Sequence, residues 1–531
     1  MNKIKNPWIL SFISVFLFAF GWPTFGHPIF LFFIFIPLFF IEKEINIDNK
    51  KNKALRIWGF SYLTFLFWNL STTWWLINAS LSGMIIANIF NSLFFSILFL
   101  SFHWSKKRLP GKGGYAFFIS VWISFEKLHL TWDISWPWLT LGNGFSEYIY
   151  WIQWYEYSGV FGGSLWILIV NIGLFEVFKN NHSFKIIFVK SLKWVFSIAF
   201  PILISLLIYI NINESNDKIK VLSIQPNIDP YEEKYLYSNN EFLDKLIKQI
   251  KSFKGQNIDY IIVPETYFAN GFGEKLNNFE LNELNAKIKK SLIGFEKTQL
   301  ITGIQFYNTY SDINKTKTSN KIRKNLWADF YNSAVAVSID YKTDYYHKSK
   351  LVVGVETLPY GDLIMPIFGK YMIDLGGTMS NRVVQKNRSI FSHPYKKIKA
   401  APVICYESIY GEFNTEYVRL GADFFATISN DAWWGNTQGH QQLLSITRLR
   451  AIENRRAIAR SANTGISSLI NEKGEYIKSL KYGSKGVILG EIPLIKSLTF
   501  YTKYGDLIAR ICILTLILYF LIAFSGRYKN Q

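Results

Sequence analysis

Three apolar stretches in the middle of the chain each lead to a side chain that could take part in acyl transfer. Those side chains are Glu265 after Tyr260–Val263, Lys348 after Val335–Ile339, and Cys405 after Ala400–Ile404. A thiol is a poor nucleophile until a base takes its proton, and a nearby carboxylate can do this. A fixed ammonium can stabilise the oxyanion that forms when the sulfur attacks a carbonyl group. Together, the three residue types predict a cysteine-based acyl-transfer site.

Each of the three residues also has an ordinary explanation. Free cysteine is usually a small buried hydrophobe, Glu265 could be the acidic residue of a helix N-terminus, and Lys348 could be a solvated lysine. Lys350 competes with Lys348 for the role of the lysine. Cys405 has no obvious disulfide partner, because the only other cysteine, Cys512, lies in an apolar C-terminal segment. It is the combination, in this order along the chain, that favours chemistry.

Composition divides the chain into a membrane part and a soluble part. Of its 531 residues, 50% are hydrophobic and 18% aromatic, and the apolar residues fill roughly the first 210 positions and the last 25. A polar middle between apolar ends predicts a membrane domain and a soluble domain. The formal net charge of +20 could suggest a nucleic-acid partner. However, the basic residues lie largely in connectors beside the apolar segments, so no nucleic acid is expected.

Eight apolar segments are candidates for transmembrane helices. They are Trp8–Gly21, Pro28–Ile41, Ile57–Ile77, Met84–His103, Tyr115–Leu128, Phe161–Val177, Trp194–Ile212 and Leu507–Phe524. The first of them resembles a signal peptide, but no small-residue cleavage site follows it, so we expect an uncleaved anchor.

Charge alternates along the connectors between these segments. Basic residues precede the first segment (Lys3, Lys5), recur in every second connector and follow the last segment, whereas the other connectors are neutral or mildly acidic. Under the positive-inside rule, the basic connectors and both termini are cytoplasmic. We therefore expect a membrane domain over residues 1–213, an extracytoplasmic domain over 214–506, and a final transmembrane helix with a short cytoplasmic tail over 507–531.

The polar middle of the chain has the pattern of an α/β domain. Short strands of the buried type alternate with helical patterns, which is typical of a layered α/β fold. The expected strands are Ile219–Ile224, Tyr260–Val263, Leu300–Phe306, Ser333–Ile339, Ala401–Ile404 and Phe424–Ser429, and the expected helices are Asn240–Phe253, Leu281–Leu292 and Gln442–Arg460. The segment Asn308–Asn325, rich in Lys, Thr, Ser and Asn, is expected to be a solvated loop.

The order of the three motifs resembles a known superfamily. Pro264-Glu265-Thr266, then Lys348-x-x-Leu351, then Cys405-Tyr406-Glu407 is similar to the nitrilase superfamily, whose Glu, Lys and Cys triad lies on an αββα sandwich. Further stretches are similar to the apolipoprotein N-acyltransferase family, the membrane-embedded branch: Thr427–Gly435, Arg448–Ala451, Arg460–Ile466, Gly21–Pro23 and Trp136–Trp138. This resemblance covers essentially the whole chain and implies eight transmembrane helices with the catalytic domain between the seventh and the eighth.

The resemblance implies roles for seven residues. Glu265 would be the general base, Lys348 the oxyanion stabiliser and Cys405 the nucleophile, and four further residues would bind substrate or support the site: Glu356, Tyr406, Glu407 and Trp433. Trp433 could equally belong to an ordinary aromatic belt. The family usually carries Pro-Phe-Gly before the second glutamate, and this chain departs from that pattern with Val353-Gly354-Val355.

The resemblance also implies a reaction and a place for it. Cys405 would take an acyl chain from a membrane phospholipid as a thioester and pass it to the α-amine of the S-diacylglyceryl-cysteine that begins a lipoprotein. The expected place is the inner membrane of a Gram-negative-type bacterium, with the catalytic domain in the periplasm and the chain acting as a monomer. No metal or other cofactor is expected, because neither His347 nor His440 has a partner at ligand spacing.

Two other functions stay open on the sequence. A membrane-anchored amidase or nitrilase that hydrolyses a small amide would use the same triad, although one anchor would suffice for it. A transporter or non-enzymatic scaffold is the second. Transport is disfavoured because the few charged residues of the apolar segments lie near segment ends, namely Glu126, Lys127, Glu176 and Arg510.

Overall fold

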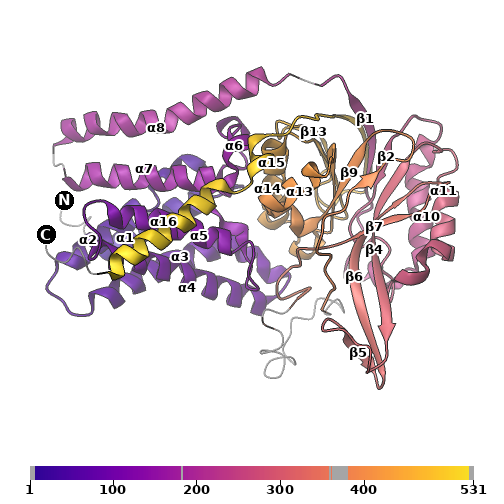
Figure 1. The fold of residues 1–531 in the computed structure, drawn as a ribbon, viewed down its shortest axis with the longest axis horizontal. Coiled ribbons are helices and arrows are strands. Elements are labelled where there is room, and N and C mark those ends of the chain that lie inside the picture. The colour runs from indigo at the N-terminus through magenta and orange to yellow at the C-terminus, as the bar shows by residue number, and fades with distance from the viewer. Residues whose placement is uncertain (1–5, 181–182, 214, 358–359, 361–380, 526–531) are drawn as a thin grey trace. The chain divides into compact units, whose positions relative to one another are not determined.

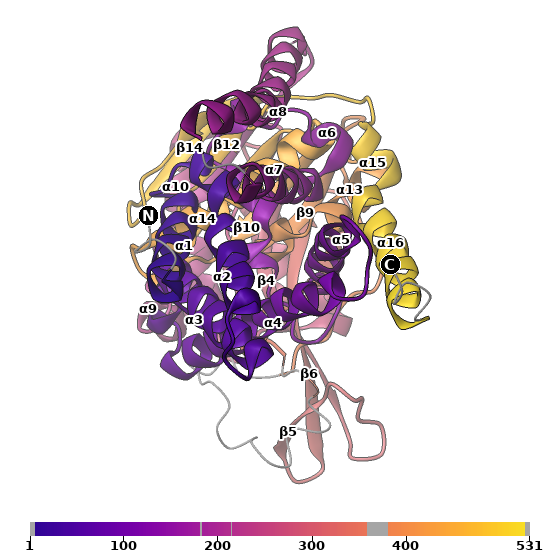
Figure 2. The ribbon, with the colours of Figure 1, turned by 90° about the vertical axis from the view of Figure 1, so that its left-hand side faces the viewer.

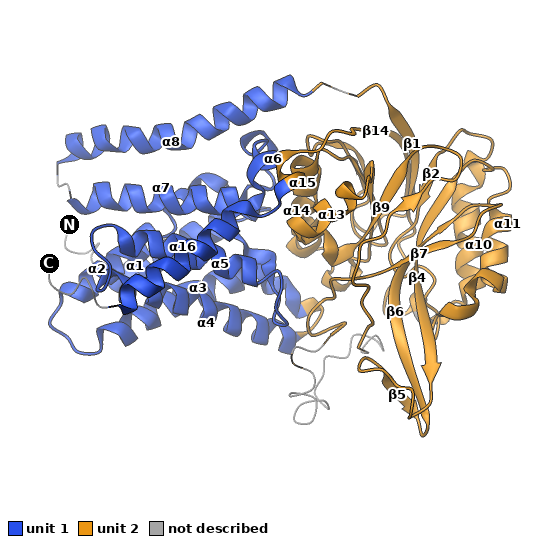
Figure 3. Cartoon of the chain, viewed as in Figure 1, with its two compact units in different colours: residues 1–77, 81–212, 504–531 blue, residues 78–80, 213–503 orange. Residues whose placement is uncertain are grey.

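The computed structural model describes residues 6–180, 183–213, 215–357, 360 and 381–525. The chain forms two compact units (Figure 3), one over residues 1–77, 81–212 and 504–531 and the other over 78–80 and 213–503. Lys3 and Lys5, which contribute to the expected orientation, lie outside the described residues.

The first unit is helical, and each predicted transmembrane segment overlaps one of its main helices. These are α1 (Pro7–Gly21), α2 (Ile36–Ile47), α3 (Lys53–Thr73), α4 (Leu81–Lys106), α5 (Gly113–Leu128), α7 (Val160–Asn180), α8 (Phe184–Asn211) and α16 (Leu507–Phe524). Among the described residues, α4, α7, α8 and α16 are long and apolar enough to cross a membrane. The predicted helix over 28–41 is wrong in its first half, because Pro28–Phe33 forms a 3-10 helix and α2 begins only at Ile36, with Pro37 in its first turn.

Aromatic side chains fill the interior of this unit. Phe18 stacks on Trp68 with ring centroids 4.3 Å apart, and Phe95 lies nearly parallel to Trp122 at 4.9 Å. Each of these side chains is almost fully buried, and large aromatic surfaces contribute much of the packing energy of such an interior. α16 packs along α5, and α8 leaves most of its surface uncovered (Figure 2).

The second unit contains two β-sheets. The first has the order β14-β1-β2-β4-β6-β5, with β3 beside β4 and β7 beside β6, and the second has the order β13-β12-β11-β10-β9-β8. The strands of the first sheet are β1 (Lys218–Gln225), β2 (Tyr260–Ile262), β3 (Glu274–Lys275), β4 (Gln299–Tyr310), β5 (Asn320–Arg323), β6 (Leu326–Val337), β7 (Asp344–His347) and β14 (Gly486–Pro493). Those of the second are β8 (Phe391–Ser392), β9 (Lys399–Ile404), β10 (Phe424–Ser429), β11 (Ile458–Ala462), β12 (Ser468–Ile470) and β13 (Tyr476–Ser479).

The two sheets pack face to face between two layers of helices (Figure 1). Ser223 of β1 donates to the carbonyl of Arg460 at 2.7 Å, and Ser461 of β11 donates to that of Ile224 at 2.6 Å. Helices α10 (Asn239–Ile250) and α11 (Glu283–Ser291) cover the first sheet, while α13 (Gly411–Arg419) and α14 (Gln438–Asn454) cover the second. The predicted layered α/β fold is confirmed.

Three local predictions are corrected. The helix expected over Gln442–Arg460 ends at Asn454, because Arg455 takes a left-handed conformation (φ 48°) and the chain enters β11, which contains Arg460. The expected loop Asn308–Asn325 is partly strand, because β4 continues to Tyr310 and β5 pairs with β6 in a hairpin. The strand expected over Ser333–Ile339 begins earlier, at Leu326, and ends at Val337.

Candidate active site

Glu265 stands just beyond the carboxyl end of β2, in the middle of its sheet. The parallel neighbours β1 and β4 hold the strand on both sides, so the position of its end is fixed by backbone hydrogen bonds. Pro264 ends the strand, and Thr266 follows in a left-handed conformation with a φ of 47°. The Glu265 side chain is buried, with 8% of its surface exposed.

Gly303 of β4 lets the Glu265 turn approach the sheet closely. The Gly303 amide donates to the Pro264 carbonyl at 3.0 Å, and its own carbonyl accepts from Phe268 at 3.1 Å. A methyl group at position 303 would lie 2.3 Å from the Thr266 nitrogen and 2.5 Å from the Glu265 Cα atom. Only glycine leaves room for this backbone-to-backbone contact.

Lys348 follows β7 and places its ammonium between two carboxylates. Its Nζ lies 2.9 Å from Glu265 Oε1 and 2.9 Å from Glu356 Oε2, and its side chain is 2% exposed. Its backbone amide donates to the Asn332 carbonyl of β6 at 2.8 Å. The structure thus brings together Glu265, Lys348 and Glu356, which are far apart in the sequence.

Asn332 ties the two carboxylates to each other. Its Nδ2 donates to Glu265 Oε1 at 2.8 Å and to Glu356 Oε1 at 2.9 Å. The other Glu265 oxygen accepts from the backbone amide of Asn430, just past β10, at 3.1 Å. Each Glu265 oxygen therefore has a donor, and the carboxylate is fixed in one orientation.

The departure from the family pattern before Glu356 does not displace this residue. Gly354, with a φ of 80°, lies in a turn in which its amide donates to the Thr357 carbonyl at 2.7 Å. The Glu356 amide donates to the Val352 carbonyl at 2.9 Å, and the Val352 amide donates back to Glu356 Oε2 at 2.9 Å. The altered segment thus still delivers Glu356 to Lys348.

Cys405 is the first residue after β9 and starts a short 3-10 helix, Cys405–Ile409. Its φ of 49° is left-handed, a conformation that a non-glycine residue adopts at a cost of order 1–3 kcal/mol. Such a sharp turn at the end of a strand presents a nucleophile above a sheet edge. The predicted strand and turn are present, and α13 begins only at Gly411.

Electrostatics couple the cysteine to the charged cluster. Burial, together with the Glu265 carboxylate, raises the pKa of the Cys405 thiol, and the Lys348 ammonium opposes this without cancelling it. Burial alone would lower the pKa of Lys348, but Glu265 and Glu356 hold it well above its ordinary value. At neutral pH the site therefore holds a neutral thiol and a charged ammonium, and the thiol must lose its proton as it attacks.

Glu407 ties the lysine segment to the cysteine segment. Its Oε1 accepts from the Ser349 amide at 2.7 Å and from the Tyr346 hydroxyl at 2.7 Å, and its Oε2 accepts from the Ile404 amide at 2.8 Å. Burial raises the pKa of this carboxyl group, which is fully enclosed, while the three donors act in the opposite direction. Glu407 thus holds the residues beside Lys348 and Cys405 in place.

Tyr406 and Trp433, the other two predicted site residues, contribute aromatic rings. Tyr406 is buried, with its ring edge-on to Tyr410 at 5.4 Å. Trp433 is partly exposed and stands edge-on to Tyr231 at 5.2 Å. The Trp433 ring also lies 5.8 Å from the Nζ of Lys234.

The sequence interpretation missed several residues that complete this site. Asn332 lies inside a long buried strand, where a polar side chain is itself a signal, because buried amides need partners. Asn430 acts through its backbone amide, which no sequence pattern reveals. Lys234 lies in the charged stretch Asp229–Lys234, which is typical of an exposed surface, yet it is buried beside Glu265.

Comparison with known proteins places the two parts of the chain in described families. Residues 220–497 match the family model described as Carbon-nitrogen hydrolase, and residues 14–173 match the one described as Apolipoprotein N-acyltransferase N-terminal domain. The apolipoprotein N-acyltransferase of Chlorobaculum tepidum is 26% identical over 461 residues, 85% of each chain. That of Rickettsia bellii is 28% identical over 476 residues, again 85% of each chain. That of Aquifex aeolicus is 26% identical over 475 residues, 86% of this chain and 93% of the relative.

Two solved structures resemble about half of the chain. Nit3 of Saccharomyces cerevisiae, a member of branch 10 of the nitrilase superfamily, is 15% identical and has a TM-score of 0.36, with 52% of this chain and 91% of that chain covered. An amidase from Nesterenkonia sp. is 13% identical with a TM-score of 0.37, with 56% of this chain and 97% of that chain covered.

Proposed function

We propose a reaction for this protein from the premise that the chain belongs to the carbon-nitrogen hydrolase family, in the branch of the apolipoprotein N-acyltransferases. The enzyme transfers an acyl chain from a membrane phospholipid to the α-amine of the N-terminal S-diacylglyceryl-cysteine of a lipoprotein. The observation that carries this proposal is the buried Lys348 ammonium between Glu265 and Glu356. The charges of Lys348 and Glu265 act on the thiol of Cys405.

In the first half-reaction, Cys405 attacks the carbonyl carbon of a phospholipid ester. Glu265 takes the thiol proton as the carbon–sulfur bond forms, so no free thiolate has to exist beforehand. Lys348 uses two of its three N–H groups on carboxylates, and the third stabilises the oxyanion of the tetrahedral adduct. Glu265 then returns the proton to the leaving oxygen, which gives a lysophospholipid and a thioester on Cys405.

In the second half-reaction, the lipoprotein amine attacks the thioester. Glu265 accepts a proton from the attacking nitrogen and gives it to the departing sulfur of Cys405, so the products are an amide and the original thiol. Both substrates carry acyl chains, and moving each buried CH₂ group into water would cost about 0.8 kcal/mol. A membrane unit that keeps both lipids in the bilayer removes this cost.

The membrane arrangement belongs to the same proposal. The eight main helices of the first unit span the inner membrane, both termini lie in the cytoplasm, and residues 214–506 form the periplasmic catalytic domain of a monomer. The four long apolar helices and the alternation of basic connectors support it.

Intact-protein mass spectrometry tests the reaction. The purified protein is incubated with phospholipid vesicles and compared with Cys405→Ala, with Cys512→Ala as the matched control because this is the other cysteine of the chain. We expect the wild type and Cys512→Ala to gain the mass of one acyl chain that hydroxylamine removes, and Cys405→Ala to gain nothing. Addition of a diacylglyceryl-cysteine peptide should clear the adduct and acylate the peptide amine.

Two further variants test the assigned roles. Glu265→Gln and Lys348→Met should each reduce the rate of adduct formation by about 100- to 1,000-fold. The first removes the base that takes the thiol proton, and the second removes the charge that stabilises the oxyanion. A wild type that takes no acyl group from any lipid, yet releases ammonia from small amides, would instead be a membrane-anchored amidase.

A further inference from the structure

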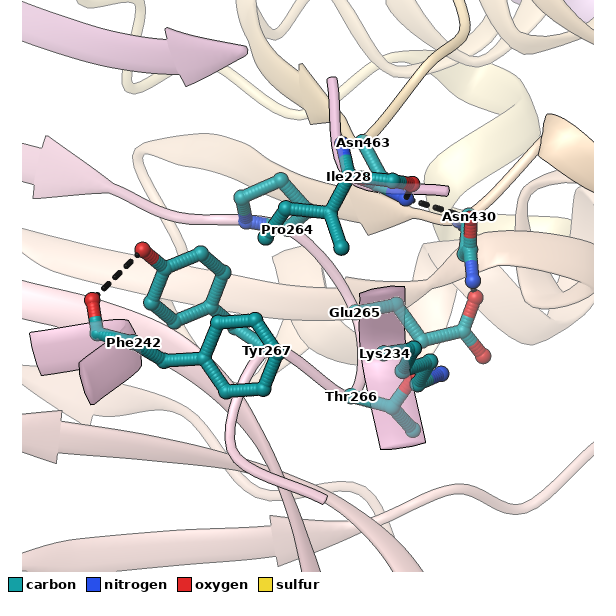
Figure 4. A pocket seen from close by; sticks show the side chains of 9 residues that line it. All are labelled: Ile228, Lys234, Phe242, Pro264, Glu265, Thr266, Tyr267, Asn430 and Asn463. Carbon is teal, nitrogen blue, oxygen red and sulfur yellow. Dashed lines mark hydrogen bonds between the residues drawn. The ribbon is translucent and has the colours of Figure 1, made fainter. Parts of the chain in front are cut away.

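A cation that the proposed mechanism does not use lies beside the catalytic carboxylate. Lys234 belongs to a one-turn helix, α9 (Glu233–Leu236), and is 7% exposed. It lines a small, half-open pocket, together with Glu265, Thr266 and six other residues (Figure 4).

The contacts of Lys234 leave most of its hydrogen-bonding capacity unused. Its Nζ donates to Thr266 Oγ1 at 2.7 Å, and the Trp433 ring lies 5.8 Å away. Among the described residues, no carboxylate lies within ion-pair distance of this ammonium. An ammonium has three donors, and buried charges in proteins are normally paired. A buried cation with unused donors thus lines a pocket next to the reacting groups.

The charge around this pocket favours an anion. Arg382 is also buried, donates to Gln305 Oε1 at 2.8 Å, and is close enough for its charge to act on Lys234. The two carboxylates of the site, Glu265 and Glu356, are already neutralised in part by their contacts with Lys348. An incoming anionic group would therefore find its partner at Lys234.

We propose that Lys234 binds the phosphodiester of the phospholipid donor and makes the site selective for phosphate-bearing lipids over neutral glycerides. This inference rests on the proposed function. The phosphodiester carries one negative charge and is separated from the reacting ester by only the few bonds of the glycerol backbone. A cation beside Glu265 is within reach of that phosphate while the ester carbonyl is at Cys405. Lys234 is a specificity-determining residue in this scheme and takes no part in proton transfer.

The experiment compares two donors that share the same esters. Initial rates of Cys405 acylation are measured by intact mass in mixed micelles, with either dioleoyl-phosphatidylethanolamine or dioleoylglycerol as the donor. In Lys234→Gln, we expect kcat/KM for the phospholipid to fall about 10- to 100-fold more than that for the diacylglycerol, as for the loss of a hydrogen bond to a charged group. Lys234→Arg should restore most of the phospholipid rate, and the exposed Lys248→Gln of α10 should leave both rates as they are.

The opposite explanation is that Lys234 only holds the Glu265 turn through Thr266. Thr266→Ala distinguishes this structural role from phosphate binding, because it removes the hydrogen bond and keeps the ammonium. The proposal is overturned if Lys234→Gln lowers kcat/KM equally for both donors and Thr266→Ala does the same. It is supported if Thr266→Ala keeps the preference for the phospholipid. If the wild type is acylated by neither donor, the proposed function fails and this inference fails with it. A wild type acylated by both donors equally overturns the inference alone.

Discussion

At the scale of single residues, the site is a cluster of charges whose protons are controlled by burial. Lys348 is held charged by two carboxylates, Cys405 is held neutral by its surroundings, and Asn332 fixes the carboxylates in one orientation. The contacts of Asn332 and Lys348 hold both carboxylates in place, and a site that is already arranged loses little energy to reorganisation during the reaction.

The pH dependence of the first half-reaction should report Lys234. Burial lowers the pKa of this ammonium to about 8; Arg382 acts in the same direction, and Glu265 and Glu356 oppose it. Lys234 is charged below that pH and neutral above it, so kcat/KM for a phosphatidylglycerol donor should fall above about pH 8. In Lys234→Arg the fall should move to higher pH, because a guanidinium stays charged. If the decrease of kcat/KM at high pH does not move in this variant, another ionisable group causes it.

At the scale of elements, two close contacts set where the reactive strand ends lie. Gly303 lets the Glu265 turn sit against β4, and Glu407 joins the segment after β7 to the end of β9. Both contacts are made by residues that take no part in the chemistry themselves.

Gly303→Ala should destabilise the catalytic unit and displace the base. The added methyl group would overlap backbone atoms that cannot move aside, so we expect a loss of about 1–3 kcal/mol in the free energy of unfolding. Adduct formation should fall more than stability alone explains. Gly59→Ala is the matched control, because a methyl group at this position in α3 meets nothing within 4 Å. Thermal unfolding in detergent and intact mass give the two readouts, and a Gly303→Ala protein that acylates normally would contradict this account.

Glu407→Gln should show that this carboxylate is a clamp. The amide would replace one accepting oxygen with a donor that faces other donors, at a cost of about 1–3 kcal/mol. The midpoint of thermal unfolding should therefore fall. Glu491→Gln of β14, where the side chain is exposed, should change stability by less than about 0.5 kcal/mol. Equal midpoints for the two variants would show that the clamp contributes nothing.

At the scale of the whole molecule, the proposed function depends on the side of the membrane on which the catalytic unit lies. The basic connectors predict a cytoplasmic side for the α2–α3 connector and a periplasmic side for the segment that joins β4 to β5. The helices by themselves do not set this direction, because α4, α7, α8 and α16 would cross a membrane either way round.

Single cysteines introduced into a Cys405→Ala, Cys512→Ala background test this orientation. Lys317→Cys, in the exposed segment that joins β4 to β5, should react with a membrane-impermeant maleimide in intact spheroplasts. Lys51→Cys, in the exposed α2–α3 connector, should react only after the membrane is opened. The reverse pattern would place the catalytic unit in the cytoplasm.

Much of this protein is determined by local features of its sequence. The apolar segments, the basic connectors and the order of Glu265, Lys348 and Cys405 are visible because each depends on neighbouring residues alone. Short apolar runs also predict buried strands, so the predicted bounds of β1, β2, β9 and β10 are close to the observed ones.

The tertiary structure alone decided what surrounds those three residues. Asn332 reaches Glu265 from 67 positions away, and Lys234 enters the site although its own segment has the charge pattern of a surface. The end of α14 at Asn454 likewise depends on β11 pairing with strands on both sides. Hydrogen bonds, close approaches and burial between distant segments exist only once the sheets pack, so no local pattern specifies them.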